Sequence, residues 1–129
     1  MSTNSSNQPD AQFLARFAEA WNKHDIDALM AFMTDDCIFH GWTGPDASGA
    51  RHIGRAAVGA AFQRAWVDFP DAAWTRARHV VSGSRGVSEW TFVGTRASDG
   101  RRVEVDGCDL FTFRGDKIRV KDSWRKARG

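Results

Sequence analysis

Asp109 has a position from which its side chain could transfer protons to a ligand. It lies in the strand-like stretch 101–114, where strict alternation puts it on the same face as Phe111 and Phe113. A carboxyl group among aromatic side chains is desolvated, which favours its neutral form and suits it to act as a proton donor or a tunable acid–base group. The structural alternative is an aspartate that is hydrogen-bonded to a neighbouring strand or helix end.

Asp122 is the second carboxylate candidate. It lies in the stretch 117–126, where it alternates in step with Val120 and Trp124. An ion pair with a nearby arginine is its structural alternative, and a single β-bulge would turn the side chain outward altogether.

Two histidines complete the set of groups capable of acid–base chemistry. His40 lies in the short strand-like stretch 37–42, and an imidazole there can act as base, acid or hydrogen-bond donor. A histidine satisfied within the core is the alternative. His52 follows a flexible loop and is either a lid residue or a solvated one.

Aromatic side chains are numerous enough to line a ligand pocket. The 129 residues include six tryptophans and nine phenylalanines but no tyrosine. Such residues at helical or strand spacing also build ordinary cores, so both interpretations stay open. The candidates for contact with a substrate are Trp42, Trp90, Phe17, Trp66, Phe111 and Trp124.

These candidates must be positioned by three helices and a run of strands. Apolar spacing predicts helices over 10–23, 26–33 and 55–68, with Asp35 and Asp36 stopping the second and Pro70 the third. A strand over 37–42 and a loop over 43–49 separate the last two helices. Alternating strands follow over 74–82, 85–97, 101–114 and 117–126, with turn residues between them.

This order of elements predicts an α+β fold. A twisted antiparallel meander with helices on one face curls around them and leaves room for a ligand cavity. We expect a polar, flexible N-terminus over 1–9 and a single domain over 10–129, with enough apolar material for a core.

Composition argues against several functional classes. The net charge of +2 is too small for a nucleic-acid footprint, and the basic residues near the C-terminus fit the outward side of an edge strand. The apolar stretches are too short to cross a membrane, so no membrane partner is expected. The N-terminus does not resemble a signal peptide, so we expect a cytoplasmic protein.

No motif for a cofactor or a metal occurs. The chain has no glycine-rich nucleotide loop, no phosphate loop and no zinc motif, so no cofactor or metal is expected. Cys37 and Cys108 are unpaired by spacing and are expected to be buried or half-buried.

The order of elements and several local segments resemble the nuclear transport factor 2-like superfamily, in particular its SnoaL-like branch of small bacterial pocket proteins, and the resemblance extends over nearly the whole chain from about Ala11. The resemblance implies a cone-shaped, cystatin-like α+β barrel whose curved antiparallel sheet wraps around three N-terminal helices. It also implies a homodimer formed through the outer face of the sheet. The segments that carry it are 17–29, 34–40, 53–58, 107–113 and 116–118.

The first half is also similar to ketosteroid isomerase. By this resemblance Asp109, in the segment Asp-Leu-Phe-Thr-Phe, matches the family's oxyanion-hole aspartate. The family's tyrosine falls on Phe17, and its catalytic base falls on Gly41, beside His40. Asp122 looks like the last-strand aspartate of limonene epoxide hydrolase, a hydrolase of similar fold, although that enzyme's Arg-x-Asp pattern is replaced here.

Together these features predict cofactor-free isomerase, cyclase or hydrolase chemistry on a small apolar or aromatic molecule that bears a carbonyl group. In this hypothesis Asp109 donates a proton to a developing enolate, and His40 or Asp122 accepts one. The alternative is a non-catalytic ligand-binding or protein-interaction domain of the same fold. An open cavity favours catalysis, whereas Trp42, Trp66 and Trp90 collapsed over it would favour the alternative.

Overall fold

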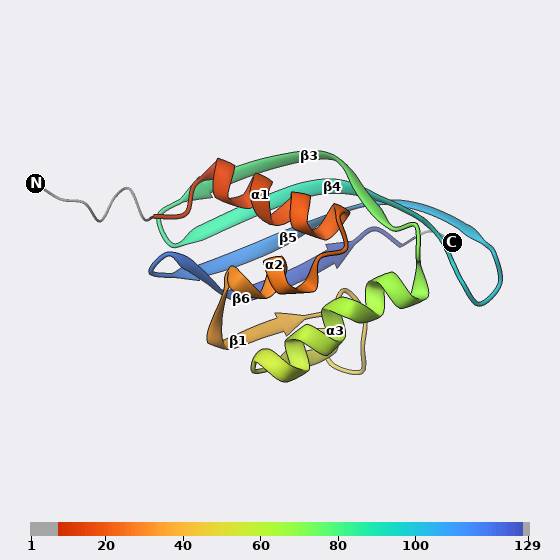
Figure 1. Cartoon of the computed structure of the whole chain (residues 1–129), viewed down its shortest axis with the longest axis horizontal. Helices are drawn as coiled ribbons and strands as arrows, with labels where there is room; N and C mark the ends of the chain where they lie inside the picture. Colours follow the sequence, from red (N-terminus) through yellow and green to blue (C-terminus); the bar gives the residue numbers. More distant parts are fainter. Residues whose placement is uncertain (1–7, 128–129) are drawn as a thin grey trace, which may run out of the picture.

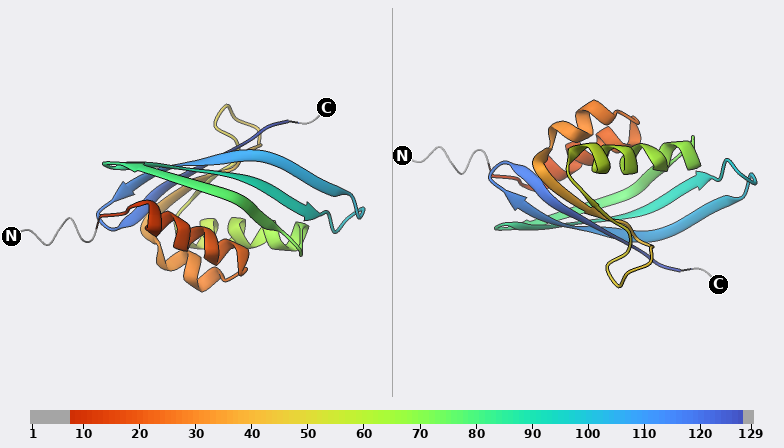
Figure 2. Two further views of the ribbon diagram at one scale, coloured as in Figure 1. Left: turned by 90° about the horizontal axis from the view of Figure 1, so that it is seen from above. Right: turned by 90° about the horizontal axis from the view of Figure 1, so that it is seen from below.

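All three helices lie on one face of a curved sheet (Figure 2). The computed structural model describes residues 8–127, so the first seven residues of the expected flexible N-terminus lie outside the described residues. The elements are α1 (Ala11–Asn22), α2 (Ile26–Ala31), β1 (Met33–His40), β2 (Arg51–Ile53), α3 (Arg55–Asp68), β3 (Ala73–Ser82), β4 (Arg85–Thr95), β5 (Arg102–Arg114) and β6 (Lys117–Arg125).

The sheet has the strand order β2-β1-β6-β5-β4-β3. The four strands β3 to β6 form the expected antiparallel meander, and β2 pairs antiparallel with β1. The pairing of β1 with β6 is parallel, which the expectation of an antiparallel sheet did not include. This pairing makes β6 a central strand, so the prediction that it lies at an edge is wrong. Figure 1 shows β6 beside β1.

The helices form where capping groups and apolar spacing coincide. Asp10 accepts a hydrogen bond from the Phe13 amide at the start of α1, and Asp25 accepts one from the Ala28 amide at the start of α2. The buried side of α1 includes Phe17 and Trp21, one helical turn apart. No helix within residues 8–127 is long and apolar enough to cross a membrane.

The first strand starts earlier than the sequence pattern indicates. The acidic pair Asp35 and Asp36 was expected to stop a helix, but both residues lie in β1, which begins at Met33. Asp36 forms ion pairs with Arg114 of β5 and Arg119 of β6. These ion pairs, with Arg114 the largest cause, lower the pKa of Asp36 to about 2. Long-range contacts across the sheet therefore override the local helix-stopping signal.

A β-bulge in β6 decides which of its side chains face the helices. Thr112 of β5 pairs with Val120 and Phe113 pairs with Ile118, so Arg119 is an extra residue in β6. Ile118 is fully buried in the core, and beyond the bulge the buried positions become Lys121 and Ser123. Alternation then puts Asp122 and Trp124 on the outer face of the sheet.

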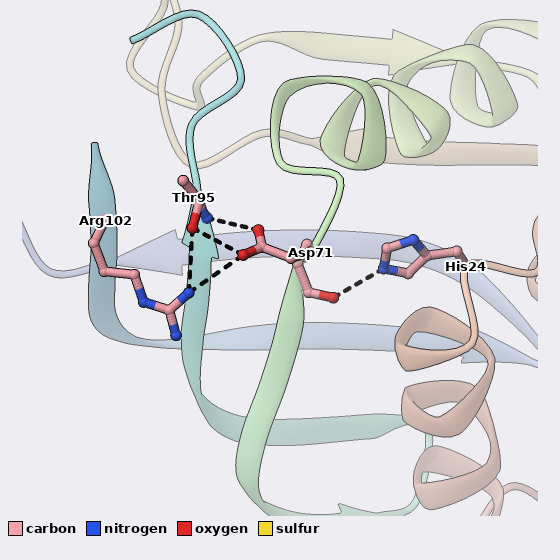
Figure 3. Close-up of polar contacts among 5 residues, drawn as sticks. His24, Asp71, Thr95 and Arg102 are labelled. Carbon is pink, nitrogen blue, oxygen red and sulfur yellow. Dashed lines mark hydrogen bonds and ion pairs between the residues drawn. The ribbon is translucent and has the colours of Figure 1, made fainter. Parts of the chain in front are cut away.

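Polar contacts hold the connection from α3 to β3 to α1's end on one side and to β4 and β5 on the other (Figure 3). The Asp71 carboxylate accepts hydrogen bonds from the Thr95 amide and hydroxyl, at 2.6 and 2.8 Å, and lies 3.3 Å from Arg102. The next residue, Ala72, is bonded through its carbonyl oxygen to His24 Nε2 at 2.9 Å. One short segment thus ties the helices to the far end of the β4–β5 hairpin.

Candidate functional site

A hollow of ligand size lies on each face of the sheet. The outer groove, of about 740 Å³, is lined by charged side chains such as Arg78 and Glu89, which pair at 2.8 Å, and it shares Trp90 and Arg125 with the hollow on the other side. The inner cavity, of about 650 Å³, lies between the sheet and α3 and falls within the range of small-molecule sites. Its wall contains cationic side chains embedded among aromatic rings, so we take the inner cavity as the candidate site.

Small residues on α3 keep this cavity open. The helix packs Val58 and Phe62 into the core, both fully buried. The alanines Ala57, Ala61 and Ala65 recur at four-residue spacing and line the cavity instead. Because alanine fills so little space, the gap between α3 and the sheet remains open.

Asp109 lies buried on the helix-facing side of β5, as the alternation predicted, with 6% of its surface exposed. Its carboxylate accepts a hydrogen bond from Trp90 Nε1 at 3.0 Å and one from the Ser123 hydroxyl at 2.5 Å. Lys121 Nζ lies 3.2 Å from the same carboxylate oxygen that Ser123 contacts. All three partners donate, so Asp109 acts as an acceptor in this network.

Lys121 is the cation of this network and is 5% exposed. Its ammonium donates to Ser123 Oγ at 2.8 Å and lies 4.6 Å from the centroid of Phe39 and 5.0 Å from that of Trp21. Burial lowers the pKa of Lys121 below its ordinary value of 10.5, and the negative charge of Asp109 acts in the opposite direction. An ammonium has three N–H donors, so one remains for a ligand.

Arg125 lies further along the same face of β6 and also lines the cavity. The carbon of its guanidinium group is 4.1 Å from the centroid of Phe92 and 4.8 Å from that of Trp42. One wall of the cavity therefore offers hydrogen-bond donors and positive charge to a ligand whose body contacts aromatic rings and alanines. Such a wall suits a molecule with an apolar body and an oxygen that carries or develops negative charge.

Two of the six predicted substrate contacts line this cavity. Trp90 lines it and also donates to Asp109, and Trp42 lies over Arg125 at its mouth. Trp42 is 52% exposed, so it does not plug the cavity.

Three other predicted contacts are part of the core. Phe17 and Phe111 pack edge to face, 5.7 Å apart, beside a hollow of only about 20 Å³ that also touches Asp109. Trp66 packs between Trp21 and His24 rather than lining the cavity. These three aromatic residues pack in or against the core and do not line the cavity.

The remaining three predicted residues lie on the other face of the sheet. Phe39 faces the cavity, so its neighbour His40 alternates outward, where it is the cross-strand neighbour of Asp122. The β6 bulge puts Trp124 on that same face, and it is 54% exposed. His40 and Asp122 are thus brought together, but away from the cavity and from Asp109.

The sequence interpretation placed three cavity residues on the wrong face of β6. Lys121, Ser123 and Arg125 were assigned to the solvent side of the last strand because the bulge at Arg119 leaves no clear mark in the sequence. His52, treated as either lid or solvated, lines the cavity and stacks on Phe39 at 5.6 Å. The usable signal was the alanine spacing on α3, which marks a helix face too small to fill its surroundings.

Family comparison agrees with the fold. A family model described as SnoaL-like domain matches residues 14–120. The comparison with curated proteins finds no match.

Among solved structures, a protein of Xanthomonas campestris proposed to be a polyketide cyclase is 23% identical, with a TM-score of 0.78 over 88% of this chain and 87% of that one. A protein of unknown function with a cystatin-like fold, also from Xanthomonas campestris, is 22% identical, with a TM-score of 0.76 over 88% of each chain. A protein with a ketosteroid isomerase-like fold from Catenulispora acidiphila, solved with trimethylamine, is 19% identical, with a TM-score of 0.72 over 86% of this chain and 82% of that one. These likenesses establish a shared fold.

Proposed function

Because the chain belongs to the SnoaL-like domain family, we propose that it is a cofactor-free enzyme that moves protons on an apolar, carbonyl-bearing molecule held in the inner cavity. One observation carries the proposal: the buried Lys121 ammonium, held by Asp109 and Ser123, borders a cavity that is otherwise mostly apolar. Buried, paired charges at a cavity wall are typical of catalytic groups.

In this proposal Lys121 is the acid and Asp109 positions it. The carbonyl oxygen of the substrate accepts the remaining N–H of Lys121. When a base removes a proton from the carbon next to the carbonyl, the electron pair of that C–H bond moves toward the oxygen, and Lys121 stabilises or protonates the resulting enolate. Returning a proton to a different carbon completes an isomerisation. In a cyclisation the enolate carbon attacks a second carbonyl, whose π electrons move to its oxygen, and the resulting alkoxide takes the proton held by the base.

His52 is the base that the geometry favours in place of His40. Its ring and the Lys121 ammonium both lie against the Phe39 ring, at 5.6 and 4.6 Å from its centroid. The register places Phe39 between His52 of β2 and Lys121 of β6, so a substrate of one or two rings must extend across the Phe39 ring to contact both groups. Asp109 is reassigned from proton donor to acceptor, because every partner of its carboxylate is a donor.

The test is exchange of the hydrogens next to the carbonyl of an apolar ketone. We would follow the exchange of 2-tetralone in D₂O by proton NMR with the wild-type protein, Lys121→Met and Lys23→Met. Lys23→Met is the matched control, because Lys23 is an exposed lysine at the C-terminal end of α1. Loss of a general acid typically costs about 10²- to 10⁴-fold in rate. We expect Lys121→Met to slow exchange by at least about 100-fold and Lys23→Met to leave it unchanged.

Two outcomes would contradict the proposal. One is exchange by folded Lys121→Met within a few-fold of wild type. The other is a wild-type protein that accelerates exchange of neither 2-tetralone nor a panel of one- to three-ring ketones. Circular dichroism of each variant would establish that it is folded.

A further inference from the structure

Arg125 is a mostly buried cation that packs against aromatic rings. Its guanidinium sits against the rings of Phe92, Trp42 and Trp90, with its central carbon 4.1, 4.8 and 5.9 Å from their centroids. Its Nε is buried and has no hydrogen-bond partner. Within residues 8–127 the guanidinium makes neither a side-chain hydrogen bond nor an ion pair, although buried charges are normally paired.

The neighbouring carboxylates do not supply the missing partner. Asp109 acts on Arg125 electrostatically, but its oxygens already accept from Lys121, Ser123 and Trp90. Asp106 accepts the Thr91 hydroxyl at 2.7 Å.

The charge on Arg125 persists at neutral pH. Burial lowers the pKa of Arg125 to about 10, and the nearby Asp109 raises it only in part. Since Lys121 is balanced by Asp109, the described wall of the cavity carries one uncompensated positive charge.

We infer that the substrate of this cavity is a small organic acid, whose carboxylate is bound by Arg125 while its carbonyl oxygen lies at Lys121. The inference rests on the proposed function, because it names the substrate class of the same site. A carboxylate would supply two acceptors to the planar fork of the guanidinium and would satisfy the buried Nε. It would also neutralise the excess charge of the wall.

The spacing along β6 sets the size of this acid. Arg125 and Lys121 lie on the same face, four residues apart, so their Cα atoms are separated by roughly 13 Å. The Lys121 ammonium donates to Ser123 Oγ at 2.8 Å, so the Lys121 side chain leans along β6 toward Arg125. An acid whose carboxylate and carbonyl are separated by one or two rings spans this distance, with its body against Trp90 and the alanines of α3.

The experiment compares acids with their neutral amides by isothermal titration calorimetry. The probes are benzoate, 2-naphthoate and biphenyl-4-carboxylate, each paired with its primary amide of nearly the same shape. We expect wild-type protein to bind at least one acid ten or more times more tightly than its amide. Equal affinity within every pair, or no acid binding at millimolar concentration, would overturn the inference without any substitution.

Single substitutions test which side chain causes the preference for acids over amides. Arg125→Gln should bind the acid and the amide equally, whereas the control Arg78→Gln, which removes one exposed positive charge from the outer face, should keep the wild-type preference. Retained preference in folded Arg125→Gln would overturn the inference. The two readouts separate the two hypotheses: a wild-type protein that prefers acids but exchanges no ketone contradicts the proposed catalysis alone, and one that exchanges ketones but binds acids and amides equally contradicts the binding inference alone.

Discussion

At the scale of single residues, Lys121 and Asp109 form a buried charge pair beside the cavity. The two side chains are 6% and 9% exposed, and each is the other's charge partner. Removing one partner of a buried pair leaves the other charge without compensation, which typically costs about 3–5 kcal/mol. The pair therefore couples the fold to the reactive group.

A double-mutant cycle measures this coupling. We expect Lys121→Met and Asp109→Asn each to lower the free energy of unfolding by about 3 kcal/mol or more, and the double variant to lose clearly less than the sum. Urea unfolding of the four proteins gives the coupling. The exposed pair Arg78–Glu89 is the control, with an expected coupling below about 1 kcal/mol. Additive losses for the buried pair would contradict the prediction.

The lowered pKa of Lys121 gives the stability a pH dependence. Burial, its largest cause, places the folded-state pKa below the unfolded value of 10.5. Between these two values the unfolded chain binds more protons, so the free energy of unfolding rises with pH across that window. We expect wild type to gain stability relative to Lys121→Met as pH approaches 10.5. Parallel stability profiles from urea unfolding would show that Lys121 has an ordinary pKa.

The sequence predicted the position of Asp109 but not that of its partners. Alternation in β5 is regular, so counting from Phe111 and Phe113 places Asp109 on the helix-facing side. The same counting fails in β6 because one extra residue, Arg119, exchanges the two faces of the strand. A bulge depends on the neighbouring strand, so spacing within β6 alone could not reveal it.

At the scale of elements, helix α3 and the ends of the meander strands followed local signals closely. The range 55–68 was predicted as observed, because its apolar spacing and the proline after it agree. Strand β2 was missed because it has only three residues and pairs with β1 across the intervening loop, and the early start of β1 was missed because Met33 pairs with Ile118, far away in the chain. Propensity is a weak guide wherever such pairing decides the structure.

The pairing of Trp90 in β4 with Gly107 in β5 requires a glycine at position 107. A Cβ added to Gly107 would lie 2.6 Å from the Trp90 ring and would also clash with the Trp124 carbonyl oxygen. We expect Gly107→Ala to displace Trp90 from Asp109 and to lower the free energy of unfolding by about 1–3 kcal/mol. Thermal unfolding and tryptophan fluorescence would measure both effects.

Gly59→Ala is the matched control for this substitution. Gly59 lies within α3, and an added Cβ would make only an ordinary contact with Met30, 3.8 Å away. Alanine is favoured over glycine in a helix by about 0.5–1 kcal/mol, so this variant should be more stable than wild type. Equal destabilisation by both substitutions would contradict the steric explanation.

At the scale of the whole molecule, the homodimer implied by the family resemblance remains a prediction. The outer face of the sheet exposes Val80 and Trp124, at 66% and 54%, and we propose that a second copy of the chain packs there. Light scattering should then give the mass of two 14.3 kDa chains, and Trp124→Glu should shift it toward one. A monomeric wild type at tens of micromolar would remove the proposal.

The parallel pairing of β1 with β6 has a consequence for how the chain is made in the cell. His40 pairs with Asp122, and the strand containing Asp122 is complete only at Arg125, 85 residues after His40. At about 5–20 residues per second, the ribosome needs roughly 4 to 17 s to add those residues. During that time α1 and α2 have been synthesised, but the centre of the sheet that covers their apolar sides has not. Newly made chains are thus exposed to aggregation or chaperone binding until translation reaches the strand that carries Lys121 and Arg125.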